Sequence, residues 1–123
     1  MTDYRQTSLD LFIAGYLTCA EWTDCSPDHE AEGLSHDFEA QATLDCMKFY
    51  SEWHASLLLA VSQDGYTWER AGHDFWLNRN GHGAGYWCRN ELPLALRERL
   101  SRASHKAGER EAYEHNGELY PFC

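Results

Sequence analysis

The segment Ala71–Cys88, which reads AGHDFWLNRNGHGAGYWC, concentrates the side chains of this chain that could do chemistry. It contains two histidines, an aspartate, an arginine flanked by asparagines, and glycines at positions 72, 81, 83 and 85. Histidine titrates near neutral pH and serves as a general base or a metal ligand. Glycine lets the backbone adopt unusual conformations and lets a ligand approach closely. The candidate motif residues are therefore His73, Asp74, Arg79, Asn80 and His82.

A metal site in this segment would use His73, His82 and Cys88, with Asp74 as a further ligand. These residue types suit zinc. Their spacing matches no zinc finger, and the chain contains no C-x-x-C pair. The spacing therefore does not favour a bound metal.

Acid–base chemistry is a second interpretation, in which His73 or His82 acts as the base and Arg79 holds an anion. The sequence contains no nucleophile elbow, phosphate-binding loop or metalloprotease motif. The run GHGAG also lacks the preceding strand and the following helix of a dinucleotide site. We therefore assign no catalytic residue and no cofactor.

The third interpretation of the segment is structural. The polar side chains of His73, Asp74, Arg79 and Asn80 would hold a tight hairpin through hydrogen bonds. The neighbouring aromatic residues would divide between the core and a surface for a partner protein, since interfaces are enriched in aromatic residues and arginine. We favour this interpretation over the two chemical ones.

Acidic residues are concentrated in the first half of the chain. The formal net charge is −10, and residues 1–60 contain eleven acidic residues but only two basic ones, Arg5 and Lys48. Such a surface repels nucleic-acid phosphates and attracts a basic protein surface, although it would also serve to keep the protein soluble. We expect a partner with a basic nucleic-acid-binding surface, contacted by Glu21, Trp22, Asp24, Asp28, Glu30, Glu32, Asp37 and Trp76. Trp22 and Trp76 are the expected apolar anchors.

Three segments have the apolar spacing of amphipathic helices. They cover residues 8–22 and 36–61, and a third helix runs from Leu92-Pro93 to the stop at Gly108. Thr7 or Ser8 and then Ser35 are expected to cap the first two helices. Between the second and third helices, the sequence predicts two short strands, His73–Leu77 and Gly85–Arg89, with a turn in which Asn80 or Gly81 adopts a positive φ. Asn116-Gly117 predicts a further hairpin at the C-terminus.

This order of elements predicts a single α+β domain over residues 1–123. Two N-terminal helices, a Gly-rich β-hairpin, a third helix and a C-terminal β-hairpin follow one another, with the helices packed on one face of a small antiparallel sheet. The residues expected in its core are Leu9, Phe12, Tyr16, Leu17, Phe49, Trp53, Leu57, Leu96 and Leu100.

The cysteines and the apolar runs indicate the cellular compartment of the protein. Five widely spaced cysteines favour free thiols over a disulfide framework. No apolar run reaches the roughly 18 residues of a membrane span, and the N-terminus lacks the features of a signal peptide. We expect a cytoplasmic protein.

The segment from Ala71 to Tyr120 resembles small proteins encoded by bacteriophages and prophages. Their pattern reads G-H-D-F-W-x-x-R-N-G-H-G-x-G-F-W, and here Tyr86 replaces the usual Phe and Cys88 an acidic residue. The N-terminal run FIAGYLTCAEW resembles their first helix. The resemblance implies a phage accessory gene product and assigns no mechanism.

Charge and this resemblance together lead to a functional expectation. We expect a non-enzymatic acidic inhibitor of a bacterial defence complex, such as a CRISPR effector or a restriction enzyme, that acts by protein–protein binding in the host cytoplasm. The alternative is a small enzyme or metal-binding protein centred on His73, Asp74, Arg79 and His82. A structural or packaging accessory is a third possibility.

Overall fold

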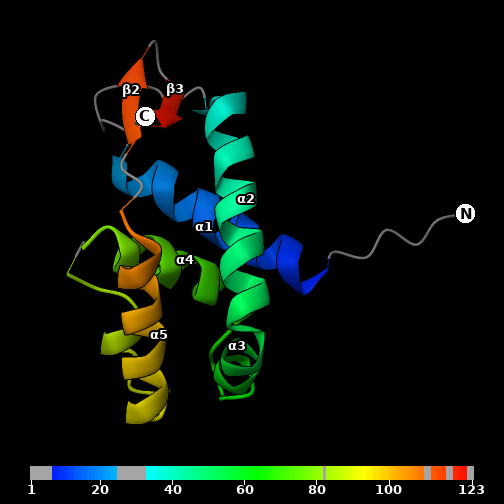
Figure 1. The fold of residues 1–123 in the computed structure, drawn as a ribbon, viewed down its shortest axis with the longest axis vertical. Coiled ribbons are helices and arrows are strands. Elements are labelled where there is room, and N and C mark those ends of the chain that lie inside the picture. Colours follow the sequence, from blue (N-terminus) through cyan, green and yellow to red (C-terminus); the bar gives the residue numbers. More distant parts are fainter. Residues whose placement is uncertain (1–6, 25–32, 82, 110–111, 116–117, 122–123) are drawn as a thin grey trace, which may run out of the picture.

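Helices form most of this molecule (Figure 1). The computed structural model describes residues 7–24, 33–81, 83–109, 112–115 and 118–121. The helical elements, in chain order, are α1 (Ser8–Asp24), α2 (His36–Glu52), α3 (His54–Val61), α4 (Trp68–Arg79), the short 3₁₀ helix η1 (Tyr86–Cys88) and α5 (Leu94–Ala107). Within the described residues, no helix has the length and apolar character needed to cross a membrane.

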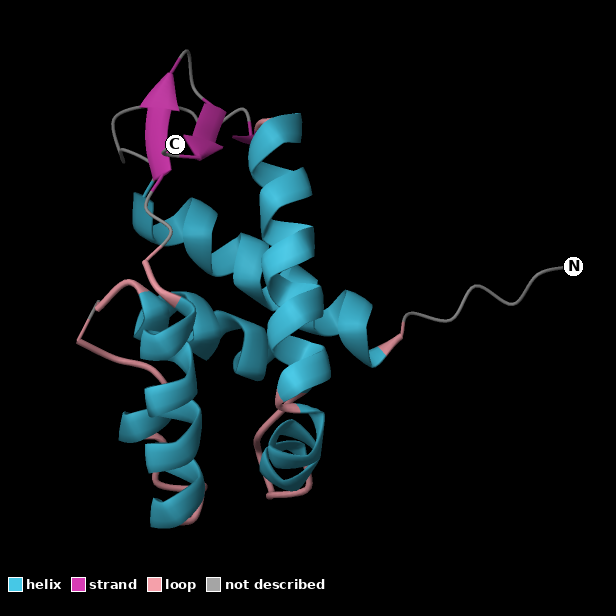
Figure 2. Cartoon of the chain, in the orientation of Figure 1, coloured by secondary structure: helices cyan, strands magenta, loops and turns pink. Residues whose placement is uncertain are grey.

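A small sheet lies at one end of the helices (Figure 2). Its strands are β1 (Gly33–Leu34), β2 (Ala112–His115) and β3 (Glu118–Pro121), in the order β1-β3-β2. β2 and β3 are antiparallel, as the C-terminal hairpin pattern predicted, with Tyr113 opposite Tyr120, whereas β1 pairs with β3 in parallel. The predicted turn residues Asn116 and Gly117 lie outside the described residues.

The predicted α+β fold class is wrong, because the body of the molecule is all-α. The buried core residues come from the helices and from the segments that join them, and the helices pack on one another rather than on a sheet. The error arises at residues 73–89, where two strands were expected. The structure instead continues α4 to Arg79 and then forms a turn and η1.

The capping residues explain where α1 and α2 begin. The Thr7 Oγ1 accepts a hydrogen bond from the backbone N–H of Asp10, whose carboxylate accepts one from the N–H of Thr7. This reciprocal pair satisfies two donors at the helix start. The Ser35 hydroxyl caps α2 in the expected way, by accepting from the N–H of Phe38.

The single helix expected over residues 36–61 is interrupted at Trp53. Trp53 has φ −117° and ψ 22°, which ends α2 and begins α3. Figure 1 shows α3 end-on while α2 is seen from the side, so the two helix axes diverge strongly. The apolar spacing continues through the break, and for that reason the spacing did not reveal it.

α1 and α4 cross at close range through two glycines. A Cβ atom at Gly15 would overlap the backbone carbonyl of Glu69, and one at Gly72 would overlap the carbonyl of Phe12. Each helix thus presents a glycine to the backbone of the other. This contact places the candidate motif, which begins at Gly72, against the centre of the core.

The core confirms most of the predicted buried residues. Phe49 stacks on Phe75 with ring centroids 4.0 Å apart and an interplanar angle of 18°. Three of the predicted set, Leu9, Leu17 and Trp53, are only partly buried. The remaining six are buried, namely Phe12, Tyr16, Phe49, Leu57, Leu96 and Leu100.

Candidate functional site

The candidate motif extends over α4, the following turn and η1. α4 begins at Thr67, whose hydroxyl accepts a hydrogen bond from the N–H of Arg70. Residues 71, 72 and 74–79 of this helix are all buried. Glu69 and Arg70 are exposed, but from Ala71 onward only His73 is not buried, so most of the helix lacks the alternation of polar and apolar faces by which an amphipathic helix is recognised.

Asp74 forms a buried ion pair with Arg89. Its carboxylate is 0 % exposed and accepts from the Arg89 guanidinium at 2.6, 2.9 and 3.1 Å, and from the Tyr66 hydroxyl at 2.7 Å. These hydrogen bonds to Asp74 raise the pKa of Arg89, and burial raises the pKa of Tyr66. The carboxylate therefore links α4 to the segment that follows η1, and its partners are all within the fold.

Arg79 connects the end of α4 to α5 and α2. Its Nε donates to the carbonyl of Gly108 at 2.7 Å and its Nη2 to that of Ala107 at 3.2 Å, so the guanidinium caps the C-terminus of α5. Its Nη1 donates to Asp45 at 2.9 Å and to the hydroxyl of Tyr16 at 3.2 Å. To hold an anion, as predicted, the Arg79 guanidinium would have to give up some of these four hydrogen bonds inside the protein.

The turn after α4 is built around Asn78 and Gly85. The side-chain oxygen of Asn78 accepts from the backbone N–H of Tyr86 at 2.7 Å, and a Cβ atom at Gly85, where φ is 141°, would overlap that oxygen. Asn80 donates through its amide to the carbonyl of Trp76, and Gly81 has the predicted positive φ of 65°. The tight turn at Asn80-Gly81 is therefore confirmed, although it follows a helix instead of joining two strands.

His73 is the one residue of α4 after its first turn that is not fully buried. It lines a cavity of about 610 Å³ between α1 and α4, together with Thr18, Thr67, Arg70 and Arg89. Burial lowers its pKa below the ordinary value; the Asp74 carboxylate opposes this shift, and the guanidiniums of Arg89 and Arg70 add to it. The lowered pKa favours the neutral imidazole, in which one ring nitrogen donates a hydrogen bond and the other accepts one.

The predicted metal ligands do not converge in the described part of the chain. No group of three or more His, Cys, Asp or Glu side chains there has the geometry to hold a metal ion. Cys88 lies close to Gly85, where its thiol donates to the carbonyl and accepts from the N–H. His82 lies outside the described residues, so the structure does not test its role.

The acidic residues expected at a partner interface are only partly described. Asp37 is exposed in the first turn of α2, and Glu21 is partly exposed near the end of α1. For Trp22 and Asp24 the structure describes the helical backbone alone. Asp28, Glu30 and Glu32 lie outside the described residues.

Trp76 does not fit the predicted role of interface anchor. Its side chain is 0 % exposed and its ring packs edge-on against Tyr16 and Phe38, at centroid distances of 5.2 and 5.9 Å. Trp76 was expected in a strand, in which alternate side chains face the solvent. It lies instead in a buried part of helix α4, which is the same difference that makes the predicted fold class wrong. The sequence offers no means of telling a buried tryptophan from an exposed one here.

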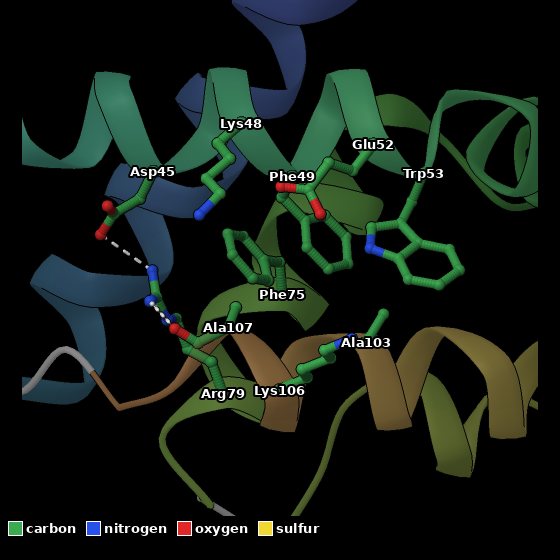
Figure 3. A pocket seen from close by; sticks show the side chains of 10 residues that line it. All are labelled: Asp45, Lys48, Phe49, Glu52, Trp53, Phe75, Arg79, Ala103, Lys106 and Ala107. Atoms are coloured by element: carbon green, nitrogen blue, oxygen red, sulfur yellow. Dashed lines mark hydrogen bonds and ion pairs between the residues drawn. The ribbon is translucent and has the colours of Figure 1, made fainter.

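A groove between α2 and α5 is the feature that sequence analysis did not find (Figure 3). The side chains of Phe75 and Arg79 from α4 form its floor, and the cavity there is about 220 Å³. Lys48, Glu52 and Trp53 reach into it from the α2 side, and Ala103, Lys106 and Ala107 from α5. The only hint in the sequence was that Lys48 is the single base among the acids of residues 6–60.

Comparison of the chain with protein-family models, with curated proteins and with solved structures found no match.

Proposed function

We propose that this chain is a phage-encoded accessory protein that inhibits a bacterial defence complex by non-enzymatic protein–protein binding in the host cytoplasm. The target would be a CRISPR effector or a restriction enzyme with a basic surface that otherwise binds nucleic acid. The observation that carries this proposal is the acidic end of the molecule, defined here by Glu21, Asp37 and Glu39. None of these three carboxylates forms an ion pair with another described residue.

The position of the acidic end supports its use as a binding surface. The C-terminal part of α1 and the N-terminal part of α2 both lie at the end of the molecule that bears the sheet (Figure 1). Asp37 and Glu39 are exposed there, and Glu21 is partly exposed. Complementary charge of this kind mainly raises the association rate and selects the partner.

The engagement of the motif's charged side chains inside the fold favours a binding function over catalysis. The charged groups of Asp74 and Arg79 are engaged in buried hydrogen bonds and ion pairs within the fold. A catalytic pair would need at least one of them to face a substrate. The motif instead explains how α4, η1 and α5 are joined, which is a structural role, although not in the β-hairpin that the sequence predicted.

Charge reversal at the acidic end tests the proposal. In Glu21→Lys/Asp37→Lys, inhibition of the target should fall at least about tenfold, and inhibition by the parent should weaken as salt rises. Inhibition is measured as DNA cleavage by purified candidate effectors and as plaque formation on bacteria that carry each defence system. Circular dichroism and thermal unfolding confirm that the variant is folded.

The matched control is Asp64→Lys/Glu69→Lys, which changes the net charge equally. Glu69 lies in the first turn of α4 as Asp37 does in that of α2, so both pairs remove one carboxylate that favours a helix start. The control should inhibit like the parent. Equal inhibition by both variants would refute the proposal, as would a loss of inhibition in His73→Ala with binding and folding intact, which would favour an enzyme.

A further inference from the structure

The groove between α2 and α5 extends along most of α5. A second cavity of about 350 Å³ continues the first one and shares Trp53, Ala103 and Lys106 with it. The α5 residues that line the two cavities run from Ala95 to Ala107. At 1.5 Å per residue this corresponds to about 18 Å, or roughly three helical turns.

The surface of the groove is apolar along its centre. The rings of Phe49 and Phe75 stack beneath its floor but are themselves buried, so the accessible aromatic surface is the partly buried indole of Trp53 beside them (Figure 3). On the α5 side the lining residues along the middle are small, namely Ala95, Ala103 and Ala107. Small side chains let another helix approach closely, and an aromatic ring at the centre of a groove is a typical binding anchor.

The edges of the groove are basic. Lys48 lies on the α2 side, and three cations, Arg99, Arg102 and Lys106, lie on the α5 side. None of the four forms an ion pair with another described residue. Three carboxylates also line the groove. Asp45 is paired with Arg79, which leaves Glu52 and Glu98 to offset the four cations. The groove therefore has an excess of positive charge in a chain whose net charge is −10.

The acidic end does not cancel this local charge. Lys48 lies eleven residues beyond Asp37 on α2, which corresponds to about 16 Å along the helix. Charges at the surface are largely screened beyond about 8 Å at physiological ionic strength. A ligand in the groove thus experiences mainly the cations that line it.

We infer that this groove binds an amphipathic helix of a partner protein, with acidic residues on both sides of its apolar stripe. The apolar stripe would lie on Trp53 and the alanines of α5, and the acidic residues would face Lys48 on one side and Arg99, Arg102 and Lys106 on the other. This is the helix-in-groove mode of recognition. A phosphate backbone fits less well, because Glu52 and Glu98 would repel its continuous charge. The inference concerns a different surface from the acidic end and does not rest on its function.

Two synthetic helical peptides of about 14 residues test the inference, a length close to that of the groove. Both have the same leucine and alanine stripe, with glutamates beside it in one and lysines in the other. Binding is followed in ¹H–¹⁵N spectra, in which the Trp53 indole signal is identified by its loss in Trp53→Phe. The glutamate peptide should shift this signal saturably, and the lysine peptide should not.

Neutralising the groove provides the matched comparison. Lys48→Gln/Lys106→Gln should weaken binding of the glutamate peptide about fivefold, since each partly screened ion pair contributes about 0.5 kcal/mol. Arg70→Gln/Arg97→Gln removes two cations that do not line the groove, and it should bind within about twofold of the parent. Unfolding curves of both variants show whether they are folded.

The inference would be overturned by the absence of a shift at Trp53, by equal shifts with the two peptides, or by an equal loss of affinity in the two double variants. Tighter binding of an oligothymidylate at Trp53 would assign the groove to nucleic acid and would also overturn it. Glu21→Lys/Asp37→Lys should bind the glutamate peptide like the parent, so the groove and the acidic end are tested separately.

Discussion

Asp74 is a buried charged residue whose ion pair we expect to contribute strongly to stability. Its carboxylate is fully buried and depends on Arg89 and Tyr66 for hydrogen bonds. Asp74→Asn keeps the shape but leaves the Arg89 cation without its counter-charge. We expect this change to lower the free energy of unfolding by about 3 kcal/mol, measured by urea denaturation.

The exposed pair of Arg70 and Glu91 is the control for Asp74. Its atoms are 3.1 Å apart, but the two side chains are 48 % and 27 % exposed. Glu91→Gln should therefore cost less than about 1 kcal/mol. Equal costs for Asp74→Asn and Glu91→Gln would show that the buried pair does not hold the fold together.

His73 should make stability depend on pH. Burial lowers its pKa in the folded protein below the ordinary 6.5, while Asp74 opposes this and the two nearby arginines assist it. Between the folded and unfolded pKa values the unfolded chain binds more protons, so this contribution is complete above about pH 6.5 and declines as the pH falls. In His73→Gln the urea midpoint should fall less between about pH 7.5 and about pH 5.5 than it does in the parent. If the urea midpoint falls equally in His73→Gln and in the parent, His73 does not contribute to the pH dependence of stability.

At the scale of elements, the crossing of α1 and α4 determines how the helices pack. Gly72→Ala would push a methyl group into the carbonyl of Phe12, so the helices must separate or shift. We expect a loss of about 3 kcal/mol by urea denaturation. Gly65→Ala is the control, because Gly65 has φ 83° but no atom within 4 Å of an added Cβ, and it should cost only about 1 kcal/mol. Similar losses in the two variants would contradict the proposed importance of the close crossing at Gly72.

At the scale of the whole molecule, one hydrophobic cluster connects α1 to α5. A chain with one core is expected to unfold in a single cooperative transition. Far-ultraviolet circular dichroism, which reports the helices, and tryptophan fluorescence, which reports the core, should therefore give the same urea midpoint. Two separate midpoints would contradict the single domain predicted over residues 1–123.

The sequence determined the elements that carry their own local signals. α1 and α5 were predicted nearly to their observed ends, because each has one apolar stripe, with a capping residue at the start of α1 and, in α5, Pro93 at the start and a stop at Gly108 with φ 87°. The cap of α2 and the positive φ of Gly81 were likewise predicted from side chains close in sequence. Local signals of this kind depend on neighbours within a few residues, so one sequence is enough to reveal them.

Only the tertiary structure decided the nature of the motif and the location of the groove. α4 is buried over most of its length after the first turn, so those residues show no alternation of polar and apolar faces, and its aromatic and glycine-rich sequence instead predicts a hairpin. The partners of Asp74 lie 8 and 15 residues away along the chain, and those of Arg79 lie 28 to 63 residues away. The groove depends on three helices at once, since Lys48, Phe75 and Lys106 meet only after α2, α4 and α5 have packed. Contacts between residues so far apart arise from packing, and no local pattern in the sequence encodes them.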